Sequence, residues 1–246
     1  MNPDISVIVV GHSEGRLIHA TVQSVAAAVD RAKAEGLAIE WLFVLDRPTE
    51  DLVKYLHDRQ PLGSNMIELD FGDLGLARNA GAQASQGRYV SFIDGDDLWC
   101  CNWLVAAYEF AQRFEKRCVL HPELRVTFEK ETFFTRNIDQ ESAEYCRDAL
   151  MEHNYWNPSA FALRDTYLEH PFCALDLENG LGYEDWYWNC ETVGAGYIHK
   201  VVPETIHGLR YKSWKDSLTV KTNSLNCVLT PNSLFALAYQ RQKQSP

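Results

Sequence analysis

The residues of this chain best suited to chemistry form an acidic tetrapeptide, Asp94-Gly95-Asp96-Asp97. It follows the apolar run 89–93, which is typical of a buried strand. Carboxylate oxygens suit hard cations such as Mg²⁺ or Mn²⁺, so a strand that ends in three carboxylates around a glycine can hold such an ion against the diphosphate of a nucleotide. The structural alternative is a solvated turn, because Asp-Gly is common turn chemistry.

Two later segments carry further polar groups. Glu184 and Asp185 open a helix expected over 183–193, and acids in a first turn are favoured by the helix dipole even without a catalytic duty. His207 and Arg210 lie in segment 205–211. A neutral imidazole is a good metal ligand and a guanidinium suits phosphate, but a lone histidine in a strand is more often a hydrogen-bonded structural residue.

The first 99 residues alternate between apolar runs and segments of helical periodicity. We expect strands over 5–10, 39–45, 66–69 and 89–93, with helices over 16–35, 49–59 and 74–86 between them. This alternation predicts a parallel sheet with right-handed crossovers, and ligands of such sheets bind at the carboxyl ends of the strands. Because Gly11, Asp46 and Asp94 each fall at a predicted strand end, these three segments should converge on one crevice.

The pattern is mixed beyond residue 99. We expect helices over 102–116 and 141–151, strands over 124–128 and 159–163, and a last helix that Thr230 caps and Pro231 begins, running to about residue 239. Aromatic residues crowd this half; most should lie in the core, although sugar-binding clefts also use aromatic faces. No Gly/Ser/Pro-rich linker divides the chain, so the sequence predicts one domain over residues 1–246.

Composition excludes several classes of partner and compartment. The 246 residues carry a formal charge of −11, which argues against binding to nucleic acid or to an anionic membrane. Seven cysteines without metal-binding spacing predict neither a disulfide framework nor a zinc site, and favour a reducing compartment. The apolar stretch 5–10 is too short for a signal peptide or a membrane span. We therefore expect a soluble, cytoplasmic protein without an integral membrane segment.

Several of these blocks, in order, resemble the family 2 glycosyltransferases with a GT-A fold. They are segment 5–11, Asp46, Gly75-Leu76-Ala77-Arg78-Asn79-Ala80-Gly81, segment 87–97 and Gly182-Tyr183-Glu184-Asp185-Trp186. The resemblance implies an α/β fold with a Rossmann-like, mostly parallel sheet flanked by helices and a mixed α+β half that binds the acceptor. On this basis residues 1–99 would bind the nucleotide sugar, 100–225 would supply the acceptor site and base, and 226–246 would form a terminal helix and tail.

The same resemblance implies an activity. Such enzymes transfer a sugar, with inversion, from a nucleotide diphosphosugar to an acceptor hydroxyl, usually with Mn²⁺ or Mg²⁺. Bacterial surface-glycan assembly, such as O-antigen or capsule, is the pathway that the family suggests, with a glycan or a lipid-linked glycan as acceptor. A lipid-linked acceptor would bring the protein to the inner face of the membrane, through a partner or a further part of a longer chain.

Site roles carry over by position from the family pattern. Asp185 matches the general base and Glu184 an acceptor-binding partner, and Asp97 would orient its neighbours. The metal would be held by Asp96, Asp94 and His207, and the nucleotide sugar by Val10, Gly11, His12, Asp46, Arg78, Asp94, Gly95 and Arg210. For Arg78 the alternative is an ordinary solvated position on a helix.

The sequence departs from the family pattern at two strand ends. Val10-Gly11-His12-Ser13 replaces Pro-Thr-Tyr-Asn after the first strand, and segment 45–50, Leu-Asp-Arg-Pro-Thr-Glu, replaces Asp-Asp-Gly-Ser-Thr-Asp after the second. Both changes leave the nucleobase open.

Three other functions fit the sequence less well. A sugar nucleotidyltransferase should carry a glycine-rich, basic loop after the first strand, and segment 11–16 is a poor version of one. A dinucleotide dehydrogenase would need Gly-x-Gly-x-x-Gly after a strand, which is missing. The serious rival is a non-catalytic nucleotide-sugar or glycan-binding scaffold, against which the presence of both Asp96 and Asp185 speaks.

Overall fold

The fold is known from a computed structural model that describes residues 2–59, 61–114, 117–212 and 218–236. Its strands are β1 (Ile5–Gly11), β2 (Ile39–Asp46), β3 (Asn65–Leu69), β4 (Tyr89–Asp94), β5 (Leu98–Trp99), β6 (Cys118–Glu129), β7 (Phe133–Arg136), β8 (Phe161–Leu163), β9 (Leu181–Gly182), β10 (Ile198–Tyr211) and β11 (Val228–Leu229). The α-helices are α1 (Ile18–Ala34), α2 (Glu50–Arg59), α3 (Leu74–Ala84), α4 (Trp103–Arg113), α5 (Arg164–Glu169), α6 (Glu184–Gly194) and α7 (Leu218–Ser224). No helix in the part of the chain that the structure describes is long and apolar enough to cross a membrane.

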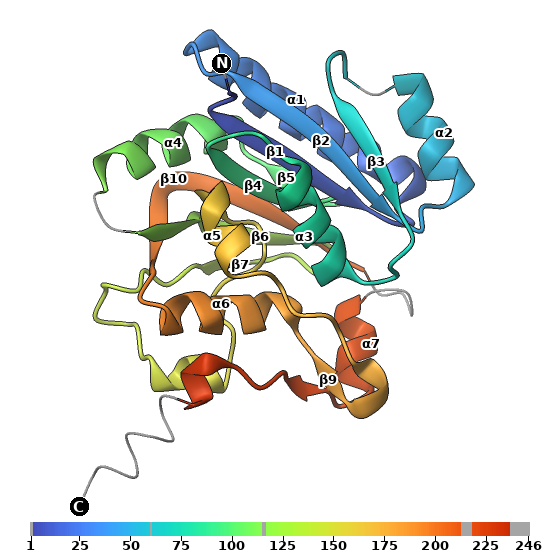
Figure 1. The fold of residues 1–246 in the computed structure, drawn as a ribbon. Helices are drawn as coiled ribbons and strands as arrows, with labels where there is room; N and C mark the ends of the chain where they lie inside the picture. Colours follow the sequence, from blue (N-terminus) through green and yellow to red (C-terminus); the bar gives the residue numbers. More distant parts are fainter. Residues whose placement is uncertain (1, 60, 115–116, 213–217, 237–246) are drawn as a thin grey trace, which may run out of the picture.

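One sheet runs through the whole molecule in the order β3-β2-β1-β4-β8-β6-β10-β5, with β7 paired to β6 and β9 paired separately to β11 (Figure 1). The four strands of the first half are parallel, which confirms the predicted β-α alternation. Their register places Val10 beside Asp94 and Gly11 beside Leu45. The ends of β1, β2 and β4 therefore lie at one edge of the sheet.

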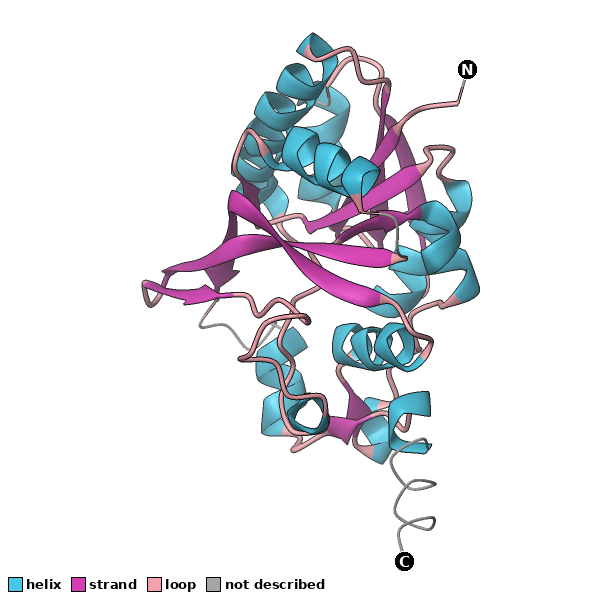
Figure 2. Cartoon of the chain, turned by 90° about the vertical axis from the view of Figure 1, so that its left-hand side faces the viewer, coloured by secondary structure: helices cyan, strands magenta, loops and turns pink. Residues whose placement is uncertain are grey.

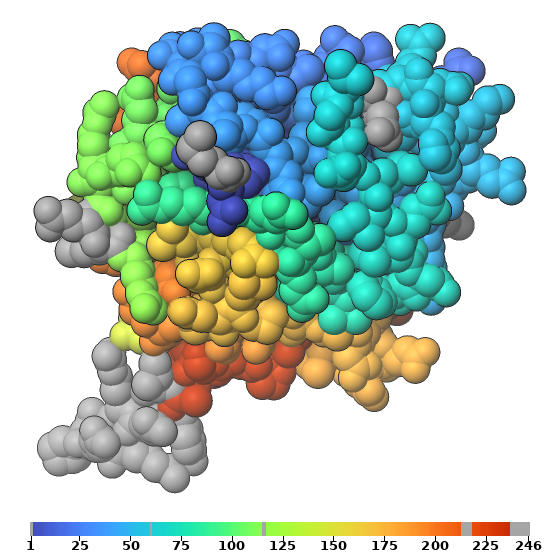
Figure 3. Space-filling model, turned by 45° about the horizontal axis from the view of Figure 1, so that its top comes forward, coloured from blue at the N-terminus to red at the C-terminus, as the bar shows by residue number. Residues whose placement is uncertain are grey.

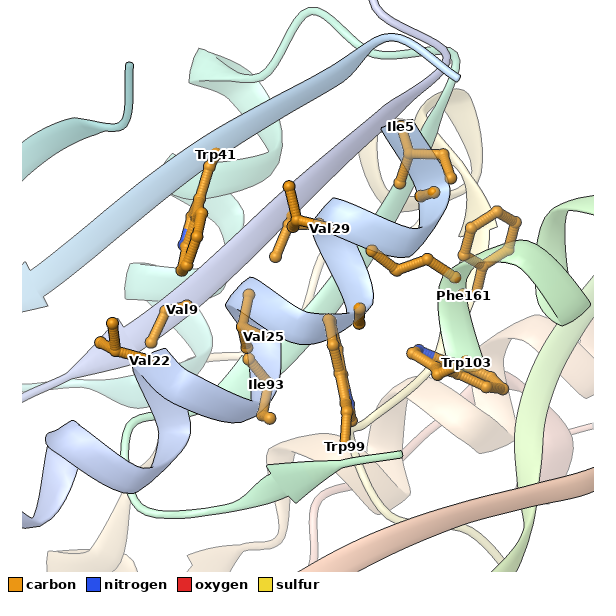
Figure 4. Packing of buried hydrophobic residues seen from close by; sticks show 14 of the residues in the cluster. Ile5, Val9, Val22, Val25, Val29, Trp41, Ile93, Trp99, Trp103 and Phe161 are labelled. Atoms are coloured by element: carbon orange, nitrogen blue, oxygen red, sulfur yellow. The ribbon is translucent and has the colours of Figure 1, made fainter. Parts of the chain in front are cut away.

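Two layers of helices bury the faces of this sheet. Alternate residues of β1, such as Val7 and Val9, pack with α1, α2 and α4, while Ile8 and Val10 pack with α3, α5 and α6. Figure 4 shows valines of α1 directed at Trp41, Ile93 and Trp99 on the first face. Every residue of β1 is buried as a result, which explains its unbroken apolar run.

Helix α3 shows why its motif reads Ala-Arg-Asn-Ala-Gly. Ala77 lies in the core, and a Cβ on Gly81 would come within 3.0 Å of Ile8 and 3.1 Å of Val44, so glycine lets the helix approach the sheet. The Asn79 side chain donates to the Phe172 carbonyl and accepts its N–H, both at 2.9 Å. This pair fixes the segment after α5 against α3, and Figure 3 shows the two side by side on the surface.

The second half of the sheet is built on two long strands, β6 and β10, which pair in parallel and cross the molecule in Figure 2. The strand expected over 124–128 is thus the C-terminal half of a longer one, β6. The strand expected over 159–163 is β8, which lies antiparallel to both β4 and β6 and joins the two halves. The β6–β7 hairpin and most of β10 were not predicted, because apolar and polar residues alternate only weakly in these segments.

The helix expected over 141–151 is wrong. Only a 3₁₀ turn, Asp148–Met151, forms there. The Asp139 carboxylate accepts the Glu141 and Val201 N–H groups and pairs with Lys200 at 2.7 Å, while the Gln140 backbone and side chain bond the backbone of His199. These hydrogen bonds hold the start of the segment against β10, so it does not adopt a helical conformation.

The last helix begins later than expected. Thr230 contacts the Gly182 carbonyl, and it is Asn232 whose side chain accepts the Phe235 N–H at 3.2 Å and whose carbonyl accepts the Ala236 N–H, so the predicted cap is wrong by two residues. The described part of this helix covers 233–236, and the expected helix ends at 116 and 239 lie outside the described residues.

A buried pair of histidines, one in β6 and one in β10, predicts that the stability of the protein falls at acid pH. His121 and His199 are fully buried, 2.9 Å apart, and stacked on Trp156. Burial lowers the pKa of His121 to about 3 and lowers that of His199 well below its usual range, with a smaller contribution from His121. The unfolded chain therefore takes up protons first as pH falls below about 6.5, and stability present above that pH is lost.

We expect the free energy of unfolding to fall by up to about 1.4 kcal/mol per pH unit for each histidine between about pH 6 and pH 4. Urea denaturation of the wild type and of His121→Phe across this range measures it. The free energy of unfolding of the variant should depend less steeply on pH, by an amount that corresponds to the uptake of about one proton. Parallel curves for the two proteins would rule out the histidine pair as the source.

Candidate active site at the carboxyl edge of the sheet

The acidic tetrapeptide forms a tight turn directly after β4. The Gly95 N–H donates to the Val10 carbonyl at 2.7 Å, Thr21 Oγ1 donates to the Gly95 carbonyl at 2.9 Å, and the Asp97 N–H donates to the Asp94 carbonyl at 3.0 Å. A Cβ on Gly95 would come within 3.0 Å of the Val10 oxygen. The turn is therefore held from β1 and α1, and its three carboxylates leave in different directions.

Each carboxylate of the turn has a cationic or N–H partner. Asp94 Oδ1 accepts from Arg78 at 2.8 Å, and Asp96 Oδ2 lies 2.6 Å from Lys212 Nζ. Burial and the neighbouring Asp97 raise the pKa of Asp96 to about 7, although Lys212 opposes the rise. The site thus concentrates negative charge that its own cations only partly offset.

Arg78 joins the turn to the start of α6. Its side chain is 0% exposed, donates to Asp94 and to Glu184 Oε1 at 2.8 and 2.7 Å, and lies 5.5 Å from the centre of the Phe172 ring. Burial alone would lower the pKa of Arg78, but Asp94, Glu184 and Asp185 raise it above its usual value. The solvated alternative for Arg78 is excluded, since its guanidinium is a buried bridge between two acidic segments.

Asp185 follows the bridged glutamate and is a partly buried residue. Its Oδ2 accepts from Asn154 Nδ2 at 3.1 Å, and Asn189 holds Asn154 in turn. Burial and Glu184 raise the pKa of Asp185 to about 7, against the opposing effect of Arg78. Tyr183, the residue before α6, has a left-handed backbone conformation with φ of 65°. Such unfavourable conformations cluster at functional sites.

His207 and Arg210 both reach the acidic turn from β10. His207 is 1% exposed, with Nδ1 2.6 Å from Asn157 Nδ2 and Nε2 3.0 Å from Asp97 Oδ2. Arg210 donates its N–H to Asp97 at 2.9 Å and its Nε–H to the Asp96 carbonyl at 3.0 Å. Asp97 therefore anchors β10. Its role in orienting neighbouring site residues stays a prediction. The metal-ligand role of His207 stays a prediction, because both ring nitrogens face protein groups here.

Asp46 organises the loop that precedes α3. Its carboxylate accepts the N–H groups of Phe71, Gly72 and Asp73 at 2.7, 3.0 and 2.7 Å, and its carbonyl lies 2.6 Å from His12 Nδ1. The side chain is thus used by backbone donors, while His12 remains exposed at the end of β1. Contacts of Val10, Gly11, His12 and Asp46 with a nucleotide stay predictions.

Two cations of the site were missed from the sequence. Lys212 directly follows β10, and the partly buried Arg125 of β6 lies close enough to Asp185 and Asp97 for both to raise its pKa, although burial lowers that pKa overall. Arg125 also donates to Thr135 at 3.0 Å. Neither residue stands in a motif. The pairing of β10 with β5 and with β6 brings them to the carboxylates, so no local signal could have identified them.

The donor set can be tested against the implied metal. Among the residues that the structure describes, no three His, Cys, Asp or Glu side chains converge to hold an ion. Magnesium, however, is commonly held by one or two carboxylates together with phosphate and water. The Asp96 carboxylate fits this role: it has hard oxygen donors and already attracts an ammonium group as a stand-in cation. Asp96 is therefore the residue best placed to hold Mg²⁺ or Mn²⁺.

Comparison with known proteins identifies the class. The sequence model of glycosyl transferase family 2 matches residues 6–169, so the chain belongs to this family of glycosyltransferases. No curated protein matches the chain.

Solved structures share the fold. S. aureus TarS 1-349 in complex with UDP-GlcNAc superposes with a TM-score of 0.69 at 18% identity, covering 86% of this chain and 60% of that one. The mannosyltransferase PcManGT from Pyrobaculum calidifontis, in complex with GDP-Man and Mn²⁺, gives 0.59 at 15% identity, with 87% and 59% covered. The chain thus spans about 60% of the length of these two solved chains and has the predicted GT-A fold.

Proposed function

We propose that the protein is an inverting glycosyltransferase that moves a sugar from a nucleotide diphosphosugar to an acceptor hydroxyl. The observation that carries this proposal is the Asp94–Arg78–Glu184 bridge. It places Asp185, a carboxylate with its pKa raised to about 7, beside the acidic turn that would receive the donor. A base of that pKa suits proton removal near neutral pH.

The proposed reaction is a single displacement. The acceptor oxygen forms a bond to the anomeric carbon while the bond from that carbon to the diphosphate breaks, and Asp185 takes the hydroxyl proton. Asn154 holds the Asp185 carboxylate in place, and Glu184, tied to Arg78, orients the start of α6. The proton ends on Asp185 and the negative charge on the leaving diphosphate.

The leaving diphosphate requires positive charge. Besides the buried Arg78, three cations lie around the acidic turn: Arg210, Lys212 and Arg125. A divalent ion bound at Asp96, with Asp94 beside it, would supply Lewis-acid stabilisation of the diphosphate. Val10, Gly11, His12, Asp46 and Gly95 line the edge where β1, β2 and β4 end, and are proposed to receive the nucleoside.

Bacterial surface-glycan assembly, with a glycan or lipid-linked glycan acceptor, is the proposed setting. This setting rests on the family alone. We propose a cytoplasmic location, at the inner face of the membrane where the acceptor is lipid-linked.

A thermal-shift panel tests this function and selects the donor. UDP, GDP, dTDP and CMP are each added with and without Mn²⁺, and one diphosphate should raise the melting temperature more with Mn²⁺ than without. Asp96→Asn should remove the metal-dependent part. The matching donor sugar should then release nucleoside diphosphate with Mn²⁺ and an acceptor.

Two results would count against the transferase. Nucleotide binding without turnover across a broad donor and acceptor panel would favour the non-catalytic scaffold. No stabilisation by any of the four nucleotides would remove the nucleotide site itself.

A further inference from the structure

The ammonium of Lys212 sits where the acidic site is most negative. Its Nζ lies 2.6 Å from Asp96 Oδ2, and the two side chains are 23% and 12% exposed. Burial alone would lower the pKa of Lys212, but Asp96, Glu14 and Asp94 raise it above its usual value. The negative charges of Glu14, three residues after β1, and of Asp94, at the end of β4, therefore add to that of Asp96 around this one lysine.

The other carboxylates of the acidic turn are engaged differently. Asp94 is held by the buried Arg78, and Asp97 by the backbone of Arg210. Those partners are fixed by burial or by strand pairing. Lys212 instead carries its charge on a flexible four-carbon stem and leaves a strand whose last residue, Tyr211, is paired with Glu129. Its backbone is anchored while its ammonium can move.

A divalent ion at Asp96 would need the oxygens that Lys212 now faces. Two cations on one carboxylate repel each other strongly where solvent is partly excluded. An incoming diphosphate changes this balance, because it offers the ammonium a second set of anionic oxygens. The lysine can then neutralise the diphosphate while Asp96 is released.

We propose that Lys212 competes with the divalent cation for Asp96, and that the donor's diphosphate relieves this competition by drawing the ammonium away. This inference rests on the proposed function. It makes metal and nucleotide binding mutually dependent: Mn²⁺ binds the free protein weakly and binds the nucleotide-loaded protein more tightly. By linkage, the same factor strengthens nucleotide binding when Mn²⁺ is present.

Direct Mn²⁺ binding tests the competition without any turnover. Free Mn²⁺ is counted by electron paramagnetic resonance during titration of the wild type, Lys212→Met, Lys212→Arg and Lys130→Met. Lys130 lies 5.7 Å from the Tyr211 ring, so its variant removes a nearby charge that does not contact Asp96. Lys212→Met should bind Mn²⁺ roughly tenfold more tightly than the wild type, a change equivalent to about 1.4 kcal/mol. Lys212→Arg and Lys130→Met should stay near the wild type.

The site is verified by adding Asp96→Asn to Lys212→Met, which should abolish the gain. A second readout repeats the titrations with the nucleoside diphosphate selected by thermal shift. The nucleotide should tighten Mn²⁺ binding to the wild type and have a smaller effect on Lys212→Met.

Equal Mn²⁺ affinities for the wild type and Lys212→Met would overturn the competition, and so would an equal gain from Lys130→Met. If all these proteins still bind nucleotide, the transferase assignment survives that failure. Loss of nucleotide binding in the wild type would instead refute the proposed function.

Discussion

Replacement of Asp185 by asparagine is expected to lower the turnover number by about 10²- to 10⁴-fold, the usual contribution of a positioned general base. Asparagine preserves the shape of the side chain and a hydrogen-bonding group opposite Asn154 but cannot accept the acceptor's proton. Donor binding should change little, because Asp185 is proposed to touch the acceptor. Initial rates and calorimetric binding of the nucleoside diphosphate measure the two effects.

The pH profile gives a second measure of the same group. The base form of Asp185 is deprotonated, and its pKa is raised to about 7, so turnover should rise with pH up to about 7 and level off above it. Asp165→Asn, an exposed aspartate in the first turn of α5, makes the same chemical change away from the site and should leave rate and profile unchanged. Full activity of Asp185→Asn would remove it as the base.

The second large effect is expected at Arg78. Arg78→Met would leave Glu184 buried and Asp94 without its cation, and breaking a buried ion pair typically costs about 3–5 kcal/mol of unfolding free energy. Urea denaturation measures this loss. Arg78→Lys keeps one charge but cannot bridge both carboxylates, so it should recover only part of the stability.

Arg113→Met is the matched control. Within the described residues, Arg113 forms an ion pair with Glu109 on the same exposed helix face, so its removal should have no measurable effect on stability. A loss at Arg78 no larger than at Arg113 would contradict the bridge. Where Arg78→Met still folds, weaker activity with an unchanged melting temperature would point instead to direct contact with the nucleotide.

The first half of the fold could be predicted because its signals are local. The continuous apolar run of β1 and the carboxylates after β4 each lie within a few residues of the element that they define. Parallel pairing then follows from the alternation of strands and helices. The convergence of Gly11, Asp46 and Asp94 at one edge needed no information from the rest of the chain.

The second half depends on distant partners. Segment 141–151 is helix-compatible, yet Asp139 and Gln140 bond to β10 about 60 residues away. Lys212 meets Asp96 across 116 positions, and Arg125 gains its acidic neighbours through strand pairing. Arg78 depends on both local and distant information. Its motif suggested a functional residue, but its full burial between Asp94 and Glu184 appears only in the three-dimensional structure.

The three-residue strand β8 has a consequence for how substrates gain access. By pairing with β4 on one side and β6 on the other, it joins the first and second halves of the chain into one continuous sheet. A hinge rotation between the two halves would break the hydrogen bonds that pair β8 with β4 and β6. Opening and closing of the site must therefore come from side chains and loops at the edge of the sheet. We therefore expect the sheet to stay rigid during catalysis, with small movements of loops and side chains in place of a closure between two halves.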